Sequence, residues 1–204
     1  FCDVVSHEPQ LEPKDILRIS SNTAMTHMTE RFEPEELHRW LGRFGFGFEP
    51  ELESAFTRPG QVNNWRNWVP QDQASITIGQ SIAVTTLQMA MAYSIIANDG
   101  LFVTPHLVEG EQVPEPYPVL SPEVAYSVRD MMTYAVANSG MRQSSIPGVS
   151  VAGKTGTADV FDPAQGMYVK GDYNLTFAGM FPAERPQAVM VVMVEKPRVD
   201  TSST

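Results

Sequence analysis

Apolar side chains recur at the spacing of an amphipathic helix in three stretches of the N-terminal two thirds of the chain. One helix is predicted over 34–44, because a proline opens it and Gly45 can take the left-handed cap. A second begins after an N-cap at Thr85 and ends near Gly100, and a third begins at Ser121. The predicted buried faces comprise Leu37, Trp40, Leu41 and Phe44; Leu87, Ala90, Met91 and Ile95; and Val124, Val128, Met131 and Ala135.

From residue 149 the period changes to short β-rich segments. The segments 149–160, 173–181 and 188–195 are separated by glycine, proline and charged turns, which predicts three sequential antiparallel strands. The connection 161–172 is long for a tight hairpin, so we expect it to project from the sheet edge. Helices first and strands last indicate an α+β fold rather than alternating βαβ units.

We interpret residues 1–204 as one partial domain, with a helical part over about 1–148 and antiparallel strands over about 149–196. The chain opens on Phe1 rather than on methionine, and it closes at Thr204 soon after an apolar strand. We therefore expect the domain to be incomplete at both ends.

Composition narrows the function classes. The net charge is −10, from 14 Lys and Arg against 24 Asp and Glu, which argues against a nonspecific grip on nucleic acid or anionic lipid. Cys2 is the only cysteine, so no internal disulfide can form. Together with four scattered histidines it leaves no cluster of metal-ligand spacing, and we expect neither a metal nor a cofactor. The longest apolar run, 188–194, is far too short for a membrane span.

A polar loop over 63–70 (NNWRNWVP) contains Trp65 and Trp68. Tryptophans in such a loop can anchor it to the core, or they can stack on a ligand. We favour the anchoring role, and ligand stacking is the alternative.

The tetrapeptide 154–157 (KTGT) lies in the first predicted strand. Lys154, Thr155 and Thr157 would present a cation and hydroxyl donors along one edge, and Gly156 lets another element approach the backbone. Such an edge suits a substrate that carries a carboxylate. Taken alone, the motif would favour the alternative of a lysine that extends to solvent from an edge strand, with glycines that mark a bulge.

A second polar cluster, Ser20-Ser21-Asn22, lies between two apolar helical patterns. Ser20 could relay a proton and Asn22 could hold an amide. The alternative is a plain capping sequence between short helices. Serine-based penicillin-binding enzymes combine a Ser-x-x-Lys element, a Ser-Asp-Asn-type element and Lys-Thr-Gly. Two of the three are present here in that order.

On these motifs the chain resembles the C-terminal part of a penicillin-binding protein transpeptidase domain, of the class B type. The stretches 76–100 (ITIGQSIAVTTLQMAMAYSIIANDG) and 41–47 (LGRFGFG) are similar to the family as well. The resemblance implies a penicillin-binding/serine β-lactamase-like fold, with a helical subdomain and an antiparallel sheet. It also implies peptidoglycan cross-linking through an acyl-serine intermediate and acylation by β-lactams.

The resemblance assigns roles to individual residues. Ser20 matches the serine that relays a proton, Asn22 the amide-holding asparagine, and Lys154 the lysine that sets the positive potential. Thr155 and Thr157 match the hydroxyls that face the substrate carboxylate, next to Gly156, and the backbone N–H of Thr157 matches an oxyanion donor.

One element is missing. The chain has four lysines, and none follows a serine by three residues. We expect the Ser-x-x-Lys nucleophile upstream of Phe1, so that this polypeptide alone should not be acylated. A noncatalytic penicillin-binding sensor or pseudoenzyme stays open as the alternative. A β-lactamase is less favoured, because no deacylating-glutamate loop is evident.

Partners and location follow from the resemblance only. It implies stem peptides ending in D-Ala-D-Ala, β-lactams, the N-terminal part of the same domain and other cell-wall synthesis proteins as partners. It further implies a place on the outer side of the bacterial cytoplasmic membrane, anchored by a segment outside this chain.

Overall fold

The computed structural model describes Asp3 and residues 7–52, 56–110, 112–139, 146–162 and 164–198. The features expected at Phe1, at Cys2 and at the C-terminal end of the chain lie outside the described residues.

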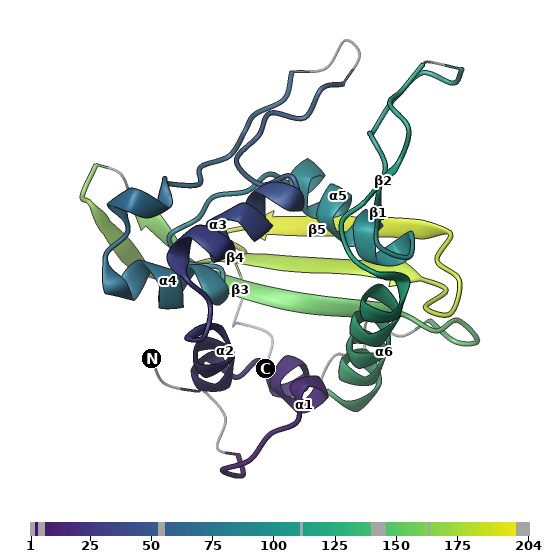
Figure 1. The fold of residues 1–204 in the computed structure, drawn as a ribbon. Helices are drawn as coiled ribbons and strands as arrows, with labels where there is room; N and C mark the ends of the chain where they lie inside the picture. Colours follow the sequence, from purple (N-terminus) through teal and green to yellow (C-terminus); the bar gives the residue numbers. More distant parts are fainter. Residues whose placement is uncertain are drawn as a thin grey trace.

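Three sequential strands form one antiparallel sheet in the order β3-β4-β5 (Figure 1). They are β3 (Ala152–Asp162), β4 (Met167–Phe181) and β5 (Ala188–Glu195), which confirms the three predicted strands. The expected long connection over 161–172 is wrong, because β3 and β4 continue through most of it. The register shifts between Asp159 and Val160, and the two strands then stay paired as far as Asp162 and Met167. In this last part, Phe161 packs edge-on against Tyr168, with ring centroids 5.3 Å apart.

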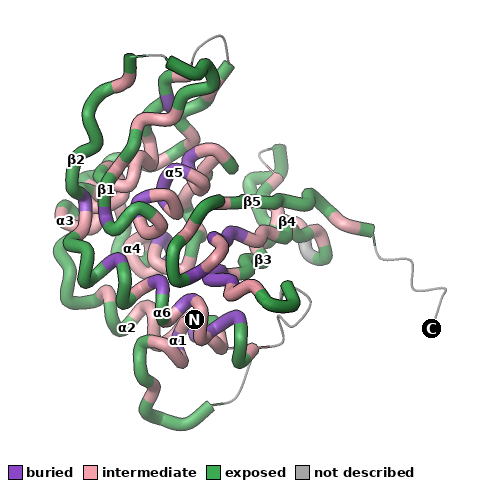
Figure 2. Tube along the Cα trace, turned by 90° about the vertical axis from the view of Figure 1, so that its right-hand side faces the viewer, coloured by how far each residue is buried: buried purple, intermediate pink, exposed green. Residues whose placement is uncertain are grey.

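Helices cover one face of this sheet, as the view in Figure 2 shows. Helix α6 (Pro122–Asn138) packs on β3, and α5 (Thr86–Ala97) packs on β4 and β5. Helix α1 (Pro13–Ile19) lies against α6. Around them lie α2 (Asn22–Thr29), which contacts α4 (Pro70–Thr77); α3 (Pro34–Arg43), which contacts the short η1 (Trp65–Asn67); and the small pair β1 (Leu101–Phe102) and β2 (Tyr117–Pro118).

The core lies where the sheet meets α5 and α6. Met132, Ala152, Met180 and Ala183 are buried together, and Leu17, Tyr93, Ile96 and Val128 are among the partly buried side chains packed against them. Because side chains alternate along a strand, Lys154 shares the helix-facing side of β3 with Ala152. The fold of the core therefore sets the direction of this lysine.

The capping signals predicted the helix ends. The Thr85 side chain accepts from Gln88 N–H at 3.1 Å and begins α5, and Gly100, with φ +91°, follows its end. Similarly, Gly45 has φ +87° beyond α3.

The predicted faces of α5 and α6 are wrong in part. The buried residues of α5 are Gln88, Met91, Ala92 and Ile95, so that Gln88 and Ala92 replace Leu87 and Ala90. Those of α6 are Ala125, Arg129, Met132, Ala135 and Val136, whereas Val124 is 48% exposed. Arg129 is buried because its guanidinium donates to the carbonyls of Ile96 and Ala97 at 3.2 and 3.4 Å, and to Asp99 at 3.1 Å. It thereby satisfies the C-terminal end of α5.

Gln88 joins three segments. Its side-chain amide is fully buried and donates to the carbonyls of Gly45, Phe48 and Pro59 at 3.3, 3.0 and 2.9 Å. Its oxygen accepts from Thr85 N–H at 3.0 Å. The loops on either side of residue 50 are thus tied to the start of α5.

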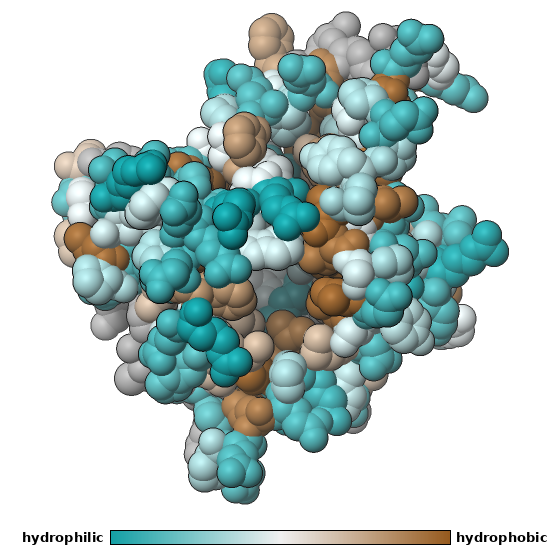
Figure 3. Space-filling model, in the orientation of Figure 1, coloured by the Kyte–Doolittle hydropathy of each residue, from teal (hydrophilic) through white to brown (hydrophobic). Residues whose placement is uncertain are grey.

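The surface in Figure 3 is mostly hydrophilic, but hydrophobic side chains gather around a hollow between α3 and α6. A pocket of about 440 Å3 lies between these helices and includes Leu37, Trp40 and Val124. In the described part of the chain, no helix is both long enough and apolar enough to span a membrane.

The substitution Gln88→Leu should destabilise the protein by about 2 kcal/mol, because a buried side chain that hydrogen-bonds to three carbonyls and to the Thr85 N–H is lost. Urea or thermal unfolding followed by circular dichroism measures this loss. The exposed Gln187→Leu variant is the control and should be near neutral. Equal stability of the two variants would contradict the tying role of Gln88.

Candidate active site

The Ser20-Ser21-Asn22 cluster forms a tight corner between α1 and α2. Ser20 ends α1 in the left-handed conformation with φ 55°, and Ser21 begins α2 by accepting from Ala24 N–H at 3.0 Å. The capping interpretation is therefore correct for Ser21. It does not compete with a chemical role for Ser20, because the two serines have separate tasks.

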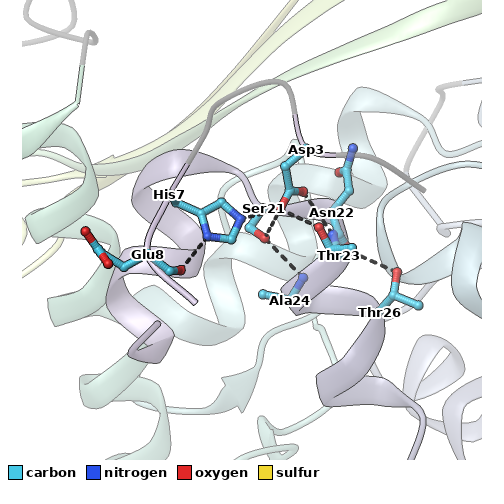
Figure 4. Close-up of polar contacts among 8 residues, drawn as sticks. All are labelled: Asp3, His7, Glu8, Ser21, Asn22, Thr23, Ala24 and Thr26. Carbon is cyan, nitrogen blue, oxygen red and sulfur yellow. Dashed lines mark hydrogen bonds and ion pairs between the residues drawn. The ribbon is translucent and has the colours of Figure 1, made fainter. Parts of the chain in front are cut away.

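Asp3, which lies 18 residues before Ser21 in the sequence, forms hydrogen bonds with this corner (Figure 4). Its carboxylate accepts from Ser21 Oγ at 2.8 Å, from Thr23 N–H at 3.0 Å and from the Thr23 hydroxyl. His7 Nε2 lies 2.6 Å from the same carboxylate, and His7 Nδ1 lies 2.7 Å from the carbonyl oxygen of Glu8. Both partners of His7 are acceptors, so the imidazole serves both contacts only when it is protonated.

The pKa values follow from this geometry. Burial alone would raise the pKa of the Asp3 carboxyl, but the hydrogen bonds from Thr23, His7 and Ser21 outweigh it and hold that pKa well below its usual range. The hydrogen bonds to the Glu8 carbonyl and to Asp3 raise the pKa of His7. The Asp3 carboxylate stabilises the start of α2, because an anion interacts favourably with the N-terminal end of a helix dipole.

Lys154 brings the two sequence motifs together. Its Nζ donates to Ser20 Oγ at 2.5 Å, across 134 positions of sequence, and to the Thr155 carbonyl at 2.9 Å. Desolvation lowers the pKa of Lys154. The amine therefore releases a proton more readily than an exposed lysine does, and it lies in contact with a hydroxyl that can carry that proton.

Asn22 begins α2, two residues beyond Ser20. Its backbone carbonyl accepts from Thr26 Oγ1 at 2.9 Å, and its side chain extends beyond the Asp3 cluster (Figure 4). Among the described residues, no hydrogen bond engages its amide. This amide is available to a ligand.

Thr155, Gly156 and Thr157 are exposed on β3. They pair with Phe177, Thr176 and Leu175 of β4, and the other edge of β3 pairs with no strand in the described part of the sheet. Alternation places the two threonine side chains on the face opposite Lys154, yet Thr155, Gly156 and Thr157 all line the same cavity as Lys154. A methyl group on Gly156 would come no closer than 3.9 Å to its neighbours. The sequence predicted that another element would approach the backbone at Gly156, and no described element does so.

A cavity of about 430 Å3 lies beside Lys154, between the sheet and the segment 76–93. Its walls include Ile76, Tyr93 and Val191. Asn174 Oδ1 is buried in the same region without a hydrogen-bond partner among the described residues, and burial raises the pKa of Tyr93 to about 12. Motif reasoning missed Asn174, Tyr93, Asp3 and His7, because no local pattern marks any of them.

A family model described as the penicillin-binding protein transpeptidase domain matches residues 3–204. The chain belongs to this family. Among curated relatives, the probable peptidoglycan D,D-transpeptidase PbpC of Pseudomonas aeruginosa is 33% identical over 195 residues, covering 95% of this chain and 34% of that protein. The chain spans about a third of the length of the curated relatives it matches.

Solved structures of penicillin-binding proteins share the fold, which confirms the expected α+β class. The apo structure of penicillin-binding protein 3 from Mycobacterium tuberculosis has a TM-score of 0.89 and 30% identity, covering 96% of this chain and 48% of that one. The same protein complexed with ampicillin has a TM-score of 0.85 and 29% identity, over 96% and 47%.

We expect Asp3→Asn to lower the free energy of unfolding by about 2 kcal/mol at neutral pH, because hydrogen bonds to a carboxylate are lost at the start of α2. A depressed folded-state pKa gives stability that is present above the unfolded pKa of about 4 and is lost as the pH falls through the folded value. The difference from wild type should therefore shrink below about pH 4, measured by urea unfolding across pH.

The exposed Asp130→Asn variant serves as the matched control for this experiment. A difference between Asp3→Asn and wild type that stayed constant down to the lowest pH would be evidence against the carboxylate as the stabilising species.

Proposed function

We propose that this chain forms the Lys-Thr-Gly and Ser-x-Asn side of the active site of a peptidoglycan D,D-transpeptidase. The single observation that carries the proposal is the 2.5 Å contact between Lys154 Nζ and Ser20 Oγ. Family membership supplies the reaction class. The relative from Pseudomonas aeruginosa is named as a probable enzyme of this kind.

In this reaction a serine attacks the carbonyl of a D-Ala-D-Ala peptide, D-alanine leaves with a proton, and the amine of a second stem peptide then takes the acyl group. The leaving amine needs that proton in the transition state. We assign its relay to Ser20 and Lys154, which share a hydrogen bond, and the amine of Lys154 has a lowered pKa. Asn22, with an uncommitted amide two residues away, holds the peptide.

Thr155, Gly156 and Thr157 are assigned to the substrate. Thr155 and Thr157 are exposed on an edge strand, where their hydroxyls can donate to a terminal carboxylate. The backbone N–H of Thr157 is assigned to the developing oxyanion. The ampicillin complex of the mycobacterial relative supports β-lactams as ligands of this chain. We assign them to the same edge, because they carry a carboxylate as well.

The nucleophile is proposed to come from a segment outside these 204 residues, because no Ser-x-x-Lys occurs among them. The 204-residue chain alone is then inactive. The same observation favours the second candidate, a noncatalytic penicillin-binding sensor or pseudoenzyme. Acylation of the full-length protein separates the two.

Peptidoglycan lies outside the cytoplasmic membrane, so we place the site on the outer side of that membrane, with an anchor outside this chain. Other cell-wall synthesis proteins are proposed partners on the same ground. The net charge of −10 speaks against nucleic acid as a partner.

In the full-length protein, Lys154→Met should lower the rate of acylation by fluorescent penicillin by about 10²–10³-fold, because proton relay and the local positive potential are both lost. Labelling time courses read on gels measure the rate. Lys196→Met removes an exposed lysine that is ion-paired with Asp172 at 3.1 Å, and it should leave the rate within about twofold. Similar rates for the two variants would contradict the assigned role.

Fluorescent penicillin should label the full-length protein and leave the folded 204-residue chain unlabelled. An adduct on the short chain would place the nucleophile within it, and mass spectrometry of the labelled peptide would identify the residue. A folded full-length protein that takes no label would favour the sensor or pseudoenzyme.

A further inference from the structure

A second groove, next to the Lys154 cavity, lies along the face of α3 that carries His38, Arg39 and Arg43. It has a volume of about 690 Å3 and lies among α3, the segment 46–48, Trp65 of η1 and Tyr117 of β2. Its lining includes the aromatic side chains of Phe46, Phe48, Trp65 and Tyr117, together with His38, Arg39 and Arg43 of α3.

Two of the aromatic side chains, Phe48 and Tyr117, are exposed yet held in place, whereas Trp65 is half-buried. Phe48 is 64% exposed, but its backbone is tied to Gln88, and Gly42 gives its ring room, since a methyl group there would lie 3.2 Å from Phe48 Cε2. Tyr117 is 49% exposed and stacks on Phe102 with centroids 5.0 Å apart. Aromatic side chains that are solvent-exposed but already held in one position lose little conformational entropy when a ligand stacks on them.

The groove is bordered by more positive than negative side chains, although the chain as a whole is negatively charged. The chain carries a net charge of −10, yet Arg39 and Arg43 lie one turn apart on α3 and border the groove, against the single carboxylate of Glu35. Both guanidinium groups are on exposed residues, where they can form paired hydrogen bonds with a carboxylate. Rings beside arginines suit a ligand with flat apolar faces and anionic groups.

We propose that this groove binds a peptidoglycan strand away from its reacting end: sugar rings on Phe48, Trp65 and Tyr117, and stem-peptide carboxylates on Arg39 and Arg43. This inference rests on the proposed function. Phe46 lines both this groove and the Lys154 cavity, so the two are neighbours across the segment that follows α3. A strand held here keeps its stem peptides close to the edge of β3. Within this proposal, Trp65 takes the ligand-stacking role that the sequence offered as the alternative for the tryptophan loop.

The test measures co-sedimentation of the full-length protein with purified sacculi that have been stripped of proteins and anionic polymers. Phe48→Ala and Arg43→Ala should each weaken binding by about tenfold, the scale of a central aromatic or arginine contact. The matched controls are Phe56→Ala, which removes a fully exposed phenylalanine outside the groove, and Arg185→Ala, which removes an exposed arginine elsewhere. Both controls should bind as wild type does.

Soluble fragments identify the ligand chemistry. A disaccharide that carries its tetrapeptide should bind more tightly than the bare disaccharide, and added salt or Arg39→Ala should remove most of that difference. Wild-type protein that does not sediment with stripped sacculi would overturn the inference, and so would groove variants that bind like the controls. Binding only to unstripped sacculi would assign the groove to a protein or another polymer instead.

Penicillin labelling of the same samples separates this inference from the proposed function. The groove variants should be labelled at the wild-type rate, which also shows that they are folded. Labelling without any groove effect on strand binding would refute only the inference. A groove effect without labelling would refute only the transpeptidase proposal. If Phe48→Ala does not fold, the surface variants Arg39→Ala and Arg43→Ala carry the test.

Discussion

The contact between the sheet and its two covering helices determines where everything else lies. Ala152, Ala178 and Met180 are almost completely buried, and their side chains let β3 and β4 lie directly on the helix layer. Since α6 packs on β3 and α1 packs on α6, one layer of contacts leads from the sheet to Ser20. The position of the lysine relative to the serine is thus a consequence of core packing.

Much of the fold could be predicted because its signals are local. Thr85, Ser121 and Gly100 mark helix ends through their own backbone chemistry, and the β-rich segments mark the strands. The buried faces could not be predicted in full. Gln88 and Arg129 are polar, and they are buried only because carbonyls from other segments need their donors, a requirement that appears after the chain has folded.

The candidate site divides in the same way. The motifs identified Ser20 and Lys154, and the fold brings their side chains into contact. Asp3 is different, because it is one acidic residue among 24 acidic residues and gains meaning only when Ser21 and Thr23 approach it. Chemistry that depends on a residue type at fixed spacing can be read from sequence. The residues that support such a residue through hydrogen bonds can be identified only in the folded structure.

The left-handed backbone at Ser20 limits which side chains can occupy that position. With φ 55°, the backbone is comfortable for glycine and tolerable for serine, but a β-branched side chain would be strongly strained there. Glycine would relieve the strain and remove the hydroxyl. Threonine would keep the hydroxyl and clash with its own backbone. Of the two aliphatic alcohol side chains, only serine both offers a hydroxyl to Lys154 and fits the left-handed backbone. Even the conservative replacement of Ser20 by threonine is therefore unfavourable at this position.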